Sequence, residues 1–338
     1  MTRNRRITLA ARPDGAVKAS DFALVEEPFT PPALRDGEVL VRNHMFAVAP
    51  TIRNWLNDSG ASYRGSIPID ATIAGMAACE VVASSHARYP VGMRMVAMSR
   101  WEDWSRLSPD SAAVPAFPIP QDMPLERAMG ALSLNSLTAY FGLLDIGRPV
   151  AGETVVVSSA AGSVGSVVCQ IARIIGCRVI GIAGGAAKCA WLREACGVDV
   201  AIDYRADDFP ARLAAACPDG INVFFDNVGG DVLQAAVDSI APHGRIVLCG
   251  QVSAYDRPGG AAGPRDLMKL VYGRVRMQGF VVGDYVDRAD EARVMLGRWI
   301  DEGLLSVRVD LRHGLAALPD AFVDLFHGAN DGTLLVKA

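Results

Sequence analysis

The middle of the chain alternates between short β-branched runs and helical stripes of apolar residues. Thr154–Val157 is β-branched throughout, which is typical of a buried strand. A polar segment containing glycines follows, and from Val164 the apolar positions recur at spacings of three and four, as on the buried face of a helix. Gly176 stands where a glycine commonly ends a helix, and Cys177–Ala183 again has the composition of a strand. The pattern predicts a strand, a turn, a helix and a second strand.

The same alternation continues towards residue 309. It predicts a further helix and four further extended segments, namely Lys188–Cys196, then Val200–Asp203, Val223–Asp226, Gly244–Cys249 and Val275–Val282. Helices and strands that alternate in this way indicate a parallel sheet covered on both faces. We therefore expect a doubly wound α/β domain over residues 131–309.

The chain before this domain has a different pattern. Strand-like runs at Glu38–Asn43, Ala78–Ala83 and Arg94–Met98 are separated by turns, and frequent prolines exclude a long helix. The tail has strand-like ends, Val307–Leu311 and Thr333–Val336, around a short helix near Pro319. We expect residues 1–130 to form a β-rich domain onto which residues 310–338 pair back.

Composition limits the partners of the protein. A chain of 338 residues is long enough for two domains, and its net charge of −4 provides no field that would attract nucleic acid or an anionic membrane. The seven cysteines lie mostly in apolar patterns without Cys-x-x-Cys spacing, which is typical of reduced core thiols. No secretory signal is recognisable at the N-terminus. We expect a cytoplasmic protein that binds a small-molecule substrate and neither nucleic acid nor membrane.

The turn after Thr154–Val157 carries the first candidate site. It has the pattern Ala-x-Gly-x-x-Gly, from Ala160 to Gly165, between a predicted strand and a predicted helix. In that context glycines let the backbone approach a pyrophosphate, whose charge then faces the free N–H groups of the helix. The candidate residues are Gly162, Ser163, Val164 and Gly165. The alternative is an ordinary crossover in which the glycines only permit close packing.

The end of the second predicted strand bears on the choice of cofactor. An NAD-specific fold usually places a carboxylate there to hold the ribose hydroxyls. This chain has Ala183, Gly184 and Gly185 instead, so a 2′-phosphate would meet no repulsion, and Lys188 could pair with it. The alternative is that Lys188 is a solvated charge on the helix surface and binds no ligand. The pattern favours NADP(H) over NAD.

Several separate blocks, in order, resemble the zinc-independent medium-chain dehydrogenase/reductases, most closely the branch of prostaglandin, alkenal double-bond and curcumin reductases. The resemblance is dense from Leu137–Leu144 through Asp203–Tyr204, and it resumes at Phe225–Gly230, Gly244–Gly250, Gln278–Val282 and Gly332–Ala338. The resemblance implies a Rossmann domain packed against a GroES-like catalytic domain that is split between the N-terminal part and the tail, with the active site in the cleft. It also implies a homodimer, formed through the sheet edge at Val275–Val282.

The resemblance further implies which residues bind NADP(H). Lys188 and Tyr204 match the lysine and tyrosine that hold the 2′-phosphate in the related reductases. The other residues expected to line the cofactor are Asn227, Cys249, Gly250, Gln251, Tyr255, Phe280, Val281, Val282 and Asn330. For the segment Asn227–Gly230, a plain turn after a strand remains an equal alternative.

No metal site is expected. Met76 occupies the position of a zinc-ligating histidine in the zinc-dependent relatives, and the five histidines are scattered along the chain. Without a Lewis acid, charge that develops on oxygen must be stabilised by hydrogen bonds. Tyr272 matches a tyrosine that the double-bond reductases use near the nicotinamide ribose, and Tyr255 is the second candidate. The alternative for Tyr272 is a helix-terminal tyrosine that packs its ring.

Two departures from the family pattern concern the substrate pocket. Thr51, in Ala49–Arg53, stands where the relatives have an aromatic hydroxyl, and Asn135, in Leu134–Ser136, lies where they have Met-Pro-Gly. Both residues are expected in the substrate pocket together with Tyr272. Trp101 and Trp104 match a segment beside the cleft, for which core packing is at least as good an explanation.

The resemblance and the vacant zinc positions predict an NADPH-dependent reductase. It would reduce the carbon-carbon double bond of α,β-unsaturated aldehydes or ketones by hydride transfer to the β-carbon. Two alternatives remain open. One is a zinc-free NADP-dependent alcohol or hydroxy-fatty-acid dehydrogenase, and the other is a non-catalytic NADPH-binding protein with a structural role.

Overall fold

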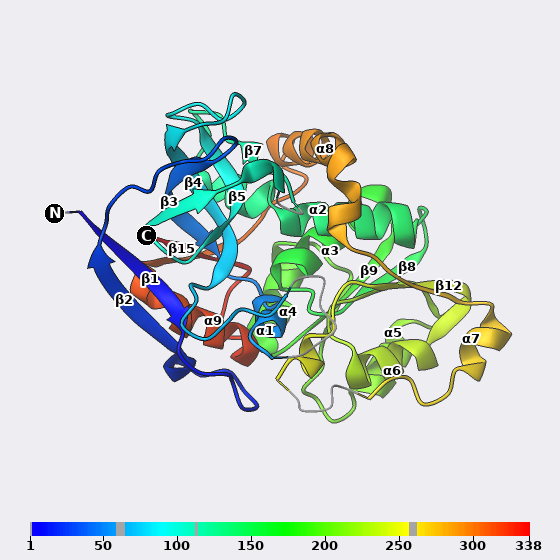
Figure 1. Cartoon of the computed structure of the whole chain (residues 1–338). Coiled ribbons are helices and arrows are strands. Elements are labelled where there is room, and N and C mark those ends of the chain that lie inside the picture. Colours follow the sequence, from blue (N-terminus) through cyan, green and yellow to red (C-terminus); the bar gives the residue numbers. More distant parts are fainter. Residues whose placement is uncertain (1, 59–64, 112–113, 257–261) are drawn as a thin grey trace. The chain divides into compact units, whose positions relative to one another are not determined.

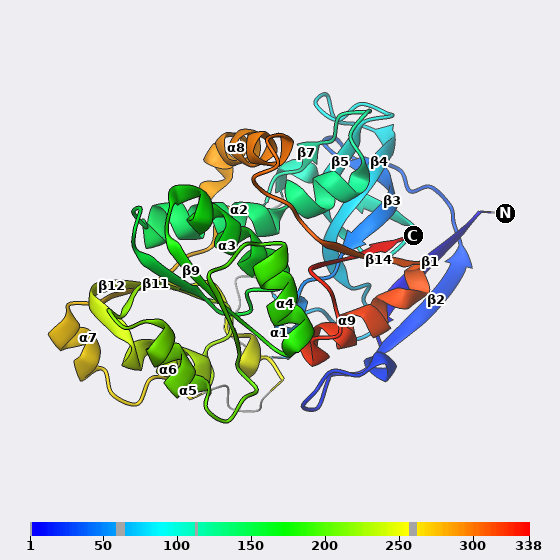
Figure 2. The ribbon, with the colours of Figure 1, turned by 180° about the vertical axis from the view of Figure 1, so that it is seen from behind.

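The computed structural model describes residues 2–58, 65–111, 114–256 and 262–338. The chain divides into two compact units, Ala131–Arg308 on the one hand and Met1–Gly130 with Val309–Ala338 on the other. Figures 1 and 2 show the chain from opposite sides. Among the described residues, no helix is both long and apolar enough to cross a membrane.

The unit Ala131–Arg308 is built on a parallel sheet. Its six strands follow the order β10-β9-β8-β11-β12-β13, and every neighbouring pair is parallel. In that order, the strands span Val200–Asp203, Arg178–Ala183, Thr154–Val157, Ile221–Asp226, Ile240–Leu248 and Arg276–Gly279. This arrangement confirms the doubly wound α/β fold, since the chain runs outwards from β8 first in one direction and then in the other.

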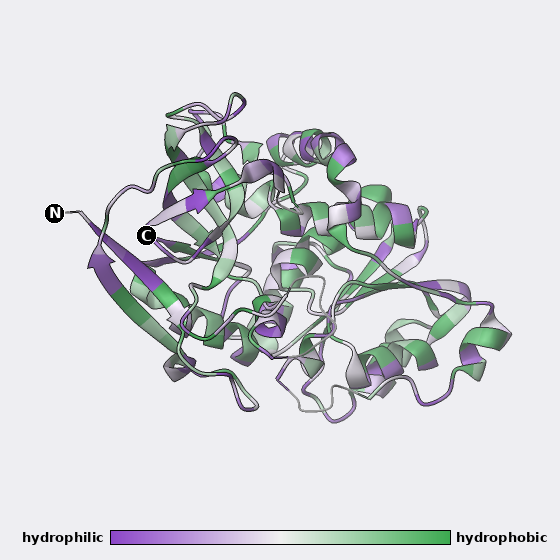
Figure 3. Cartoon of the chain, in the orientation of Figure 1, coloured by the Kyte–Doolittle hydropathy of each residue, from purple (hydrophilic) through white to green (hydrophobic). Residues whose placement is uncertain are grey.

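Helices cover both faces of this sheet. One apolar cluster joins Val156 and Ile180 of the strands to α5 and α6, whereas α3 packs against α2 (Figures 1 and 2). The helices and helical turns are α2 (Leu134–Phe141), η4 (Gly142–Gly147), α3 (Ser163–Ile175), α4 (Ala186–Glu194), α5 (Phe209–Ala216), α6 (Gly230–Asp238), η5 (Val252–Ala254), α7 (Met268–Gly273), η6 (Val282–Arg288) and α8 (Ala289–Asp301). Figure 3 shows mostly apolar strands, and each fully buried aliphatic side chain contributes about 1.5–3 kcal/mol.

Most predicted elements of this unit are present. Gly176 ends α3 with a left-handed φ of 92°, as expected for a C-terminal glycine. The expectation of one extended segment over Val275–Val282 was wrong, because β13 covers only Arg276–Gly279 and η6 begins at Val282. Phe280 lies between them, and its ring packs edge-on against Phe225 at a centroid distance of 6.5 Å. The chain therefore leaves the strand direction directly after Gly279.

The other unit is rich in β-structure. A hairpin of β1 (Arg3–Leu9) and β2 (Phe22–Pro28) accompanies a seven-stranded sheet of order β14-β15-β3-β4-β5-β7, in which β6 pairs with β3. The remaining strands are β3 (Val39–Ala47), β4 (Ala74–Ser84), β5 (Arg94–Arg100), β6 (Trp104–Leu107), β7 (Phe117–Pro118), β14 (Val309–His313) and β15 (Thr333–Lys337), and the helices and turns are η1 (Ala19–Asp21), α1 (Ile52–Trp55), η2 (Pro109–Ser111), η3 (Arg127–Ala131), η7 (Leu315–Ala317) and α9 (Leu318–His327). Strand β15 pairs antiparallel with β3, so the tail does pair back onto the first part of the chain.

The two tryptophans of the segment 101–104 have structural contacts. Trp101 is fully buried, and its ring lies 6.1 Å from Phe22 and 5.9 Å from Phe322 between centroids. Trp104 stacks on Phe29 at 5.1 Å. Both rings therefore have partners within their own unit, and Trp101 belongs to its core.

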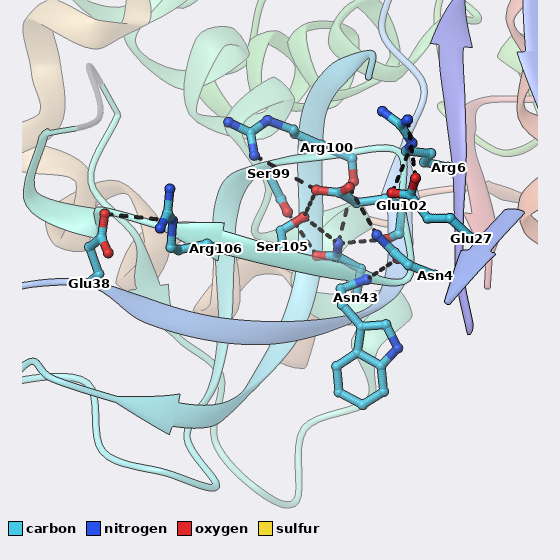
Figure 4. A network of polar contacts seen from close by, with 11 residues as sticks. Asn4, Arg6, Glu27, Glu38, Asn43, Ser99, Arg100, Glu102, Ser105 and Arg106 are labelled. Atoms are coloured by element: carbon cyan, nitrogen blue, oxygen red, sulfur yellow. Dashed lines mark hydrogen bonds and ion pairs between the residues drawn. The ribbon is translucent and has the colours of Figure 1, made fainter. Parts of the chain in front are cut away.

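A buried polar network joins the strands of this unit (Figure 4). The amide of Asn43 donates hydrogen bonds to the Glu102 carbonyl oxygen at 2.7 Å and to Ser105 Oγ at 3.1 Å. Ser99 Oγ donates to Asn43 Oδ1 at 2.9 Å, and Ser105 Oγ donates to the Glu102 carboxylate at 2.7 Å. Burial raises the pKa of Glu102 above its usual value.

Candidate functional site

The glycine-containing turn brings helix α3 close to the carboxyl end of β8. A Cβ placed on Gly165 would lie 2.4 Å from the Ser159 carbonyl oxygen and 2.8 Å from Ala160 Cα, so only glycine permits this approach. Gly162 is the residue that precedes α3, which begins at Ser163. The first N–H groups of α3 have no partner within the helix and point towards this edge, which suits an anionic pyrophosphate.

Neighbouring strand ends are tied to this turn by hydrogen bonds. The Asn227 backbone N–H donates to Ser158 Oγ at 2.7 Å, and its side-chain amide donates to the Ser158 carbonyl oxygen at 2.7 Å. Ser158 Oγ in turn donates to Asp226 at 2.9 Å. Asp226 is buried, accepts the N–H groups of Val228 and Gly229, and has its pKa raised by that burial. Asn227 was among the predicted cofactor residues, whereas its hydrogen-bond partner Ser158 and the neighbouring Asp226 were not.

The segment after β12 reaches the same edge. The N–H groups of Cys249 and Gly250 both donate to the Asp226 carbonyl oxygen, at 2.8 and 3.1 Å. A Cβ placed on Gly250 would lie 3.4 Å from the Asn227 carbonyl oxygen and 3.5 Å from the Tyr255 hydroxyl. The Tyr255 hydroxyl therefore lies at the carboxyl edge, near the glycine turn. Burial raises the pKa of the Cys249 thiol to about 12, which keeps it protonated at neutral pH.

Two further predicted residues lie beside this edge. A Cβ placed on Gly229 would lie 2.5 Å from Gln251 Cγ, so the Gln251 side chain rests against that glycine. A Cβ on Gly142 would lie 2.5 Å from Phe280 Cζ, which fixes the Phe280 ring between helix and sheet. Val281 is exposed, and Val282 begins η6. Gln251 follows β12 and Phe280–Val282 follow β13, and their contact with the cofactor stays a prediction.

Asn135 contacts the residue that opens α3. Its side-chain amide donates a hydrogen bond to Ser163 Oγ at 3.0 Å. Asn135 was expected in a substrate pocket and Ser163 at the cofactor, and the structure joins the two. The bond orients the Ser163 hydroxyl at the start of the helix.

The end of β9 is flanked by a tyrosine and an arginine. A Cβ placed on Gly184 would lie 2.9 Å from Tyr204 Cε1 and 3.0 Å from Arg205 Nε, so both side chains lie against this glycine. The Arg205 guanidinium carbon lies 5.8 Å from the centre of the Tyr204 ring. Lys188 lies in the first turn of α4 and is partly buried. Arg205 was missed by sequence reasoning, although its position directly after Tyr204 was a usable signal.

One carboxylate lies near this group, and it is already engaged. Asp203 Oδ1 accepts the Arg205 backbone N–H at 3.0 Å. Hydrogen bonds from the backbone of Gly185 and Arg205 lower the pKa of Asp203 below its usual value. The carboxylate therefore holds the loop that presents Arg205, and the end of β9 itself carries no acid.

Tyr272 lies at the other edge of the sheet. It belongs to α7, which directly precedes β13 and contacts β12. Because β12 and β13 are parallel, α7 stands at the amino edge, whereas the glycine turn follows the carboxyl end of β8. Arg276, the first residue of β13, donates to the carbonyl oxygen of Ile146, which precedes β8. Tyr272 is 73 % exposed, and it lies at the opposite edge of the sheet from Gly162–Gly165.

The other candidates belong to the β-rich unit. Thr51 directly precedes α1, and the Asn330 side-chain amide donates to the Gly332 carbonyl oxygen at 2.9 Å, just before β15. Met76 lies in β4. Over the described ranges, which leave out 59–64, 112–113 and 257–261, no group of three His, Cys, Asp or Glu side chains is placed to hold a metal ion.

The carboxyl edge of the parallel sheet has the parts that a dinucleotide requires. The close approach at Gly165 leaves backbone N–H groups for a pyrophosphate, the Arg205 guanidinium lies against Gly184 just after β9, and Lys188 belongs to the first turn of the helix that follows. Tyr255 and Asn227 lie at the adjoining strand ends. The residues present therefore fit a phosphorylated dinucleotide.

Comparison with known proteins extends over nearly the whole chain. Family models described as "N-terminal domain of oxidoreductase" and "Zinc-binding dehydrogenase" match residues 5–114 and 163–298. The chain is 37% identical to the NADPH-dependent curcumin reductase of Escherichia coli, covering 99% of this chain and 97% of that one. It is 34% identical to prostaglandin reductase 1 of Bos taurus, covering 94% of each.

A solved structure agrees with these sequence relatives. The crystal structure of CurA from Vibrio vulnificus superposes with a TM-score of 0.92 and 38% identity, covering 99% of this chain and 98% of that one. The same protein has been solved in complex with NADPH. Together with the two-unit fold and the arrangement at the carboxyl edge, these likenesses show that the chain belongs to the zinc-independent reductase branch of the medium-chain dehydrogenase/reductases.

Proposed function

We propose that the protein is an NADPH-dependent reductase of carbon-carbon double bonds conjugated to a carbonyl group. The observation that carries the cofactor is the end of β9, where Tyr204 and Arg205 lie against Gly184 and no carboxylate projects from the strand end. The double bond as target is supported by the relatives, whose names include curcumin and prostaglandin reductases. The protein is proposed to act in the cytoplasm as a homodimer.

The cofactor would be held by residues of the α/β unit. The pyrophosphate would face the N-terminus of α3 at Gly162–Gly165, with Asn135 orienting Ser163. The 2′-phosphate would pair with Lys188 and Arg205 beside Tyr204. Asn330 stays a predicted cofactor residue on the family resemblance alone. When bound, NADPH supplies the hydride that is transferred to the substrate β-carbon.

The residues of the chain would stabilise the charge that appears as hydride adds. Addition to the β-carbon moves an electron pair towards the carbonyl oxygen, so an enolate develops there. A hydroxyl donor at this oxygen stabilises the enolate, and the α-carbon then takes up a proton. Tyr255, whose hydroxyl lies at the carboxyl edge, is a candidate on the cofactor side. Tyr272 is proposed as the donor to the substrate, with Thr51 and Asn135 shaping the pocket.

The test uses the absorbance of reduced nicotinamide. Purified protein is mixed with NADPH and a panel of conjugated enals and enones, each paired with its saturated analogue. We expect NADPH loss with the unsaturated member only, and a product in which the carbonyl group is retained. The proposal is refuted if the panel is silent while calorimetry shows bound NADPH.

The alternative activity is distinguished by running the reverse reaction. A zinc-free alcohol dehydrogenase would reduce NADP⁺ with alcohols or hydroxy-fatty acids, and it would consume NADPH with saturated aldehydes. A non-catalytic NADPH-binding protein would bind the cofactor and turn over neither panel.

A further inference from the structure

Helices α2 and α3 are joined by a side-chain hydrogen bond between their first turns. Asn135, the second residue of α2, donates its side-chain N–H to Ser163 Oγ at 3.0 Å. Ser163 is the first residue of α3, and the two helices pack against each other. The bond therefore fixes a side chain at the point where α3 begins.

The segment that makes this bond departs from the family pattern. The relatives have Met-Pro-Gly where this chain has Leu134–Ser136, and none of those three side chains carries a hydrogen-bond donor. The block that does resemble the family begins directly afterwards, at Leu137. The hydrogen bond to Ser163 is therefore a property of this chain and is not implied by the resemblance.

The bond leaves the proton of the Ser163 hydroxyl available. A serine hydroxyl accepts on its oxygen and donates its single proton, and here the oxygen accepts the N–H of Asn135. Within the part of the chain that the structure describes, this hydroxyl donates to no protein group. Ser163 is also partly exposed, so its proton can reach a group that is not part of the chain.

The available proton lies among the groups expected to bind the pyrophosphate. Gly162, Ser163 and Val164 are partly exposed, whereas Gly165 is buried beside the Ser159 carbonyl oxygen. The first N–H groups of a helix have no partner within it. An O–H donor beside them can add a bond to a charged phosphate oxygen, and such a bond is roughly twice as strong as one between neutral groups.

Without Asn135 the Ser163 hydroxyl would have another acceptor to turn to. Serine hydroxyls in helices bond readily to the backbone carbonyl oxygen of the residue four positions earlier. For Ser163 that residue is Ser159, whose carbonyl oxygen lies beside the turn, 3.2 Å from a Cβ placed on Gly162. The amide of Asn135 holds the hydroxyl oxygen from the side of α2, and the proton must then point away from that amide.

We propose that Asn135 is a positioning residue for NADPH, which holds the Ser163 hydroxyl so that Ser163 donates its proton to the pyrophosphate. The inference rests on the proposed function, because it requires NADPH at the start of α3. It gives Asn135 a role on the cofactor side besides the predicted one in the substrate pocket. It also predicts tighter binding of the pyrophosphate than the N–H groups of α3 would give by themselves.

A double-mutant cycle tests whether Asn135 acts through Ser163. Isothermal titration measures the Kd of NADPH for the wild type, Asn135→Ala, Ser163→Ala and the double variant. We expect Ser163→Ala to raise the Kd about 10-fold, as for a lost bond to a charged group, and Asn135→Ala about 3-fold, because the hydroxyl remains. Once Ser163 is replaced, Asn135→Ala should change the Kd by less than about 2-fold. Losses that simply multiply would overturn the inference.

Thr138→Val is the matched control on α2. The Thr138 hydroxyl donates to the Leu134 carbonyl oxygen of the same helix at 2.8 Å, so this variant removes a side-chain hydrogen bond that does not reach α3. We expect its Kd for NADPH to equal that of the wild type. A loss as large as that of Asn135→Ala would mean that any disturbance of α2 weakens binding, and the specific role of Asn135 would be wrong.

Adenosine 2′-monophosphate distinguishes the two phosphate sites. It carries the 2′-phosphate but no pyrophosphate, so it lacks the group to which Ser163 is proposed to donate. We expect its Kd to be the same for the wild type, Asn135→Ala and Ser163→Ala, although both variants bind NADPH more weakly. If this probe and NADPH lose affinity equally, the variants distort the whole site and the inference fails.

Asn135→Asp reverses the polarity of the contact. Its carboxylate only accepts, so the Ser163 proton would turn to it and be lost to the pyrophosphate. The new charge also repels the pyrophosphate, and the same substitution in the Ser163→Ala background measures that repulsion alone. We expect Asn135→Asp to raise the Kd of NADPH by a larger factor when Ser163 is present. Equal factors in the two backgrounds would contradict Ser163 as the donor.

These measurements separate the inference from the function on which it rests. If the wild type binds no NADPH, the proposed function fails and the inference fails with it. If the wild type binds NADPH and the cycle shows no coupling, the proposed function stands and the role of Asn135 fails. If the cycle shows coupling but no enone is reduced, the positioning role stands and only the proposed reaction fails.

Discussion

Replacing Gly184 by aspartate restores the acid that NAD-specific folds carry at the end of this strand. The side chain would enter the space against which Tyr204 and Arg205 now lie, since even a Cβ there would be 2.9 Å from the ring and 3.0 Å from Nε. Arg205 would turn towards the new carboxylate, and the 2′-phosphate would face a negative charge. We therefore expect the preference for NADPH over NADH to fall.

The size of the effect follows from two contributions. Arg205 is exposed, so losing its pairing with a phosphate costs about 0.5–1 kcal/mol. A carboxylate a few ångströms from a phosphate in a partly solvated site adds repulsion of about 1–2 kcal/mol. The sum of about 1.5–3 kcal/mol corresponds to a roughly 10- to 150-fold higher Kd for NADPH. Binding of NADH should change little, because it has no 2′-phosphate and the ribose hydroxyls can bond to the acid.

Isothermal titration of both cofactors measures this difference. Gly184→Ala is the control, because its Cβ displaces the same side chains without adding charge. Its NADPH affinity should fall less than that of Gly184→Asp. If Gly184→Asp loses equal affinity for NADPH and NADH, the end of β9 does not contact the 2′-phosphate. That result would refute the proposed pairing of Arg205 with this phosphate.

Three further predictions concern other parts of the chain. Gly165→Ala should lower the free energy of unfolding by about 1–3 kcal/mol and weaken NADPH binding, because its Cβ would lie 2.4 Å from the Ser159 carbonyl oxygen. Gly162→Ala is the control, since its Cβ would lie 3.2 Å from the same atom, and it should lose less free energy of unfolding in urea titrations. Tyr255→Phe removes a hydroxyl at the carboxyl edge and should raise the Kd of NADPH by about 2- to 10-fold, measured by fluorescence titration, and an unchanged Kd would contradict a cofactor role. Burial raises the pKa of Glu102 in the fold, so its own contribution to the free energy of unfolding falls as pH rises from the unfolded value of 4.5 through the folded one. Wild type should therefore lose stability relative to Glu102→Gln over this pH range in urea titrations, and parallel stability curves for the two proteins would contradict the shift.

The elements that could be predicted are those with a strong local pattern. Thr154–Val157 forms β8, because a run of β-branched residues favours a strand. The apolar residues spaced by three and four from Val164 lie in α3, because that spacing places them on one face of a helix. The end of β13 could not be placed, because its residues are mostly exposed and the apolar residues Phe280–Val282 continue the strand-like pattern beyond Gly279. The opposite edge strand, β10, was bounded correctly, because its two middle residues are buried.

The site shows the same division. Gly162–Gly165 and Asn227 lie at one edge because a parallel fold brings the carboxyl ends of strands together, and their binding of the cofactor stays a prediction. Ser158 and Asp226 belong to no recognisable sequence motif, and they tie the strand ends together through hydrogen bonds such as that from Ser158 Oγ to Asp226 at 2.9 Å. Because the two residues are distant in sequence, such a pair can be identified only once the alignment of neighbouring strands is known.

Tyr272 illustrates a different limit of sequence comparison. A residue matched to a catalytic position carries no information on where the fold places it. The structure adds that information through direction: a residue that precedes a parallel strand lies at the amino edge, and a residue that follows one lies at the carboxyl edge. Tyr272 precedes β13, whereas Gly162–Gly165 follow β8, so the two lie at opposite edges of the sheet. The catalytic role of Tyr272 therefore stays a prediction that rests on the family resemblance alone.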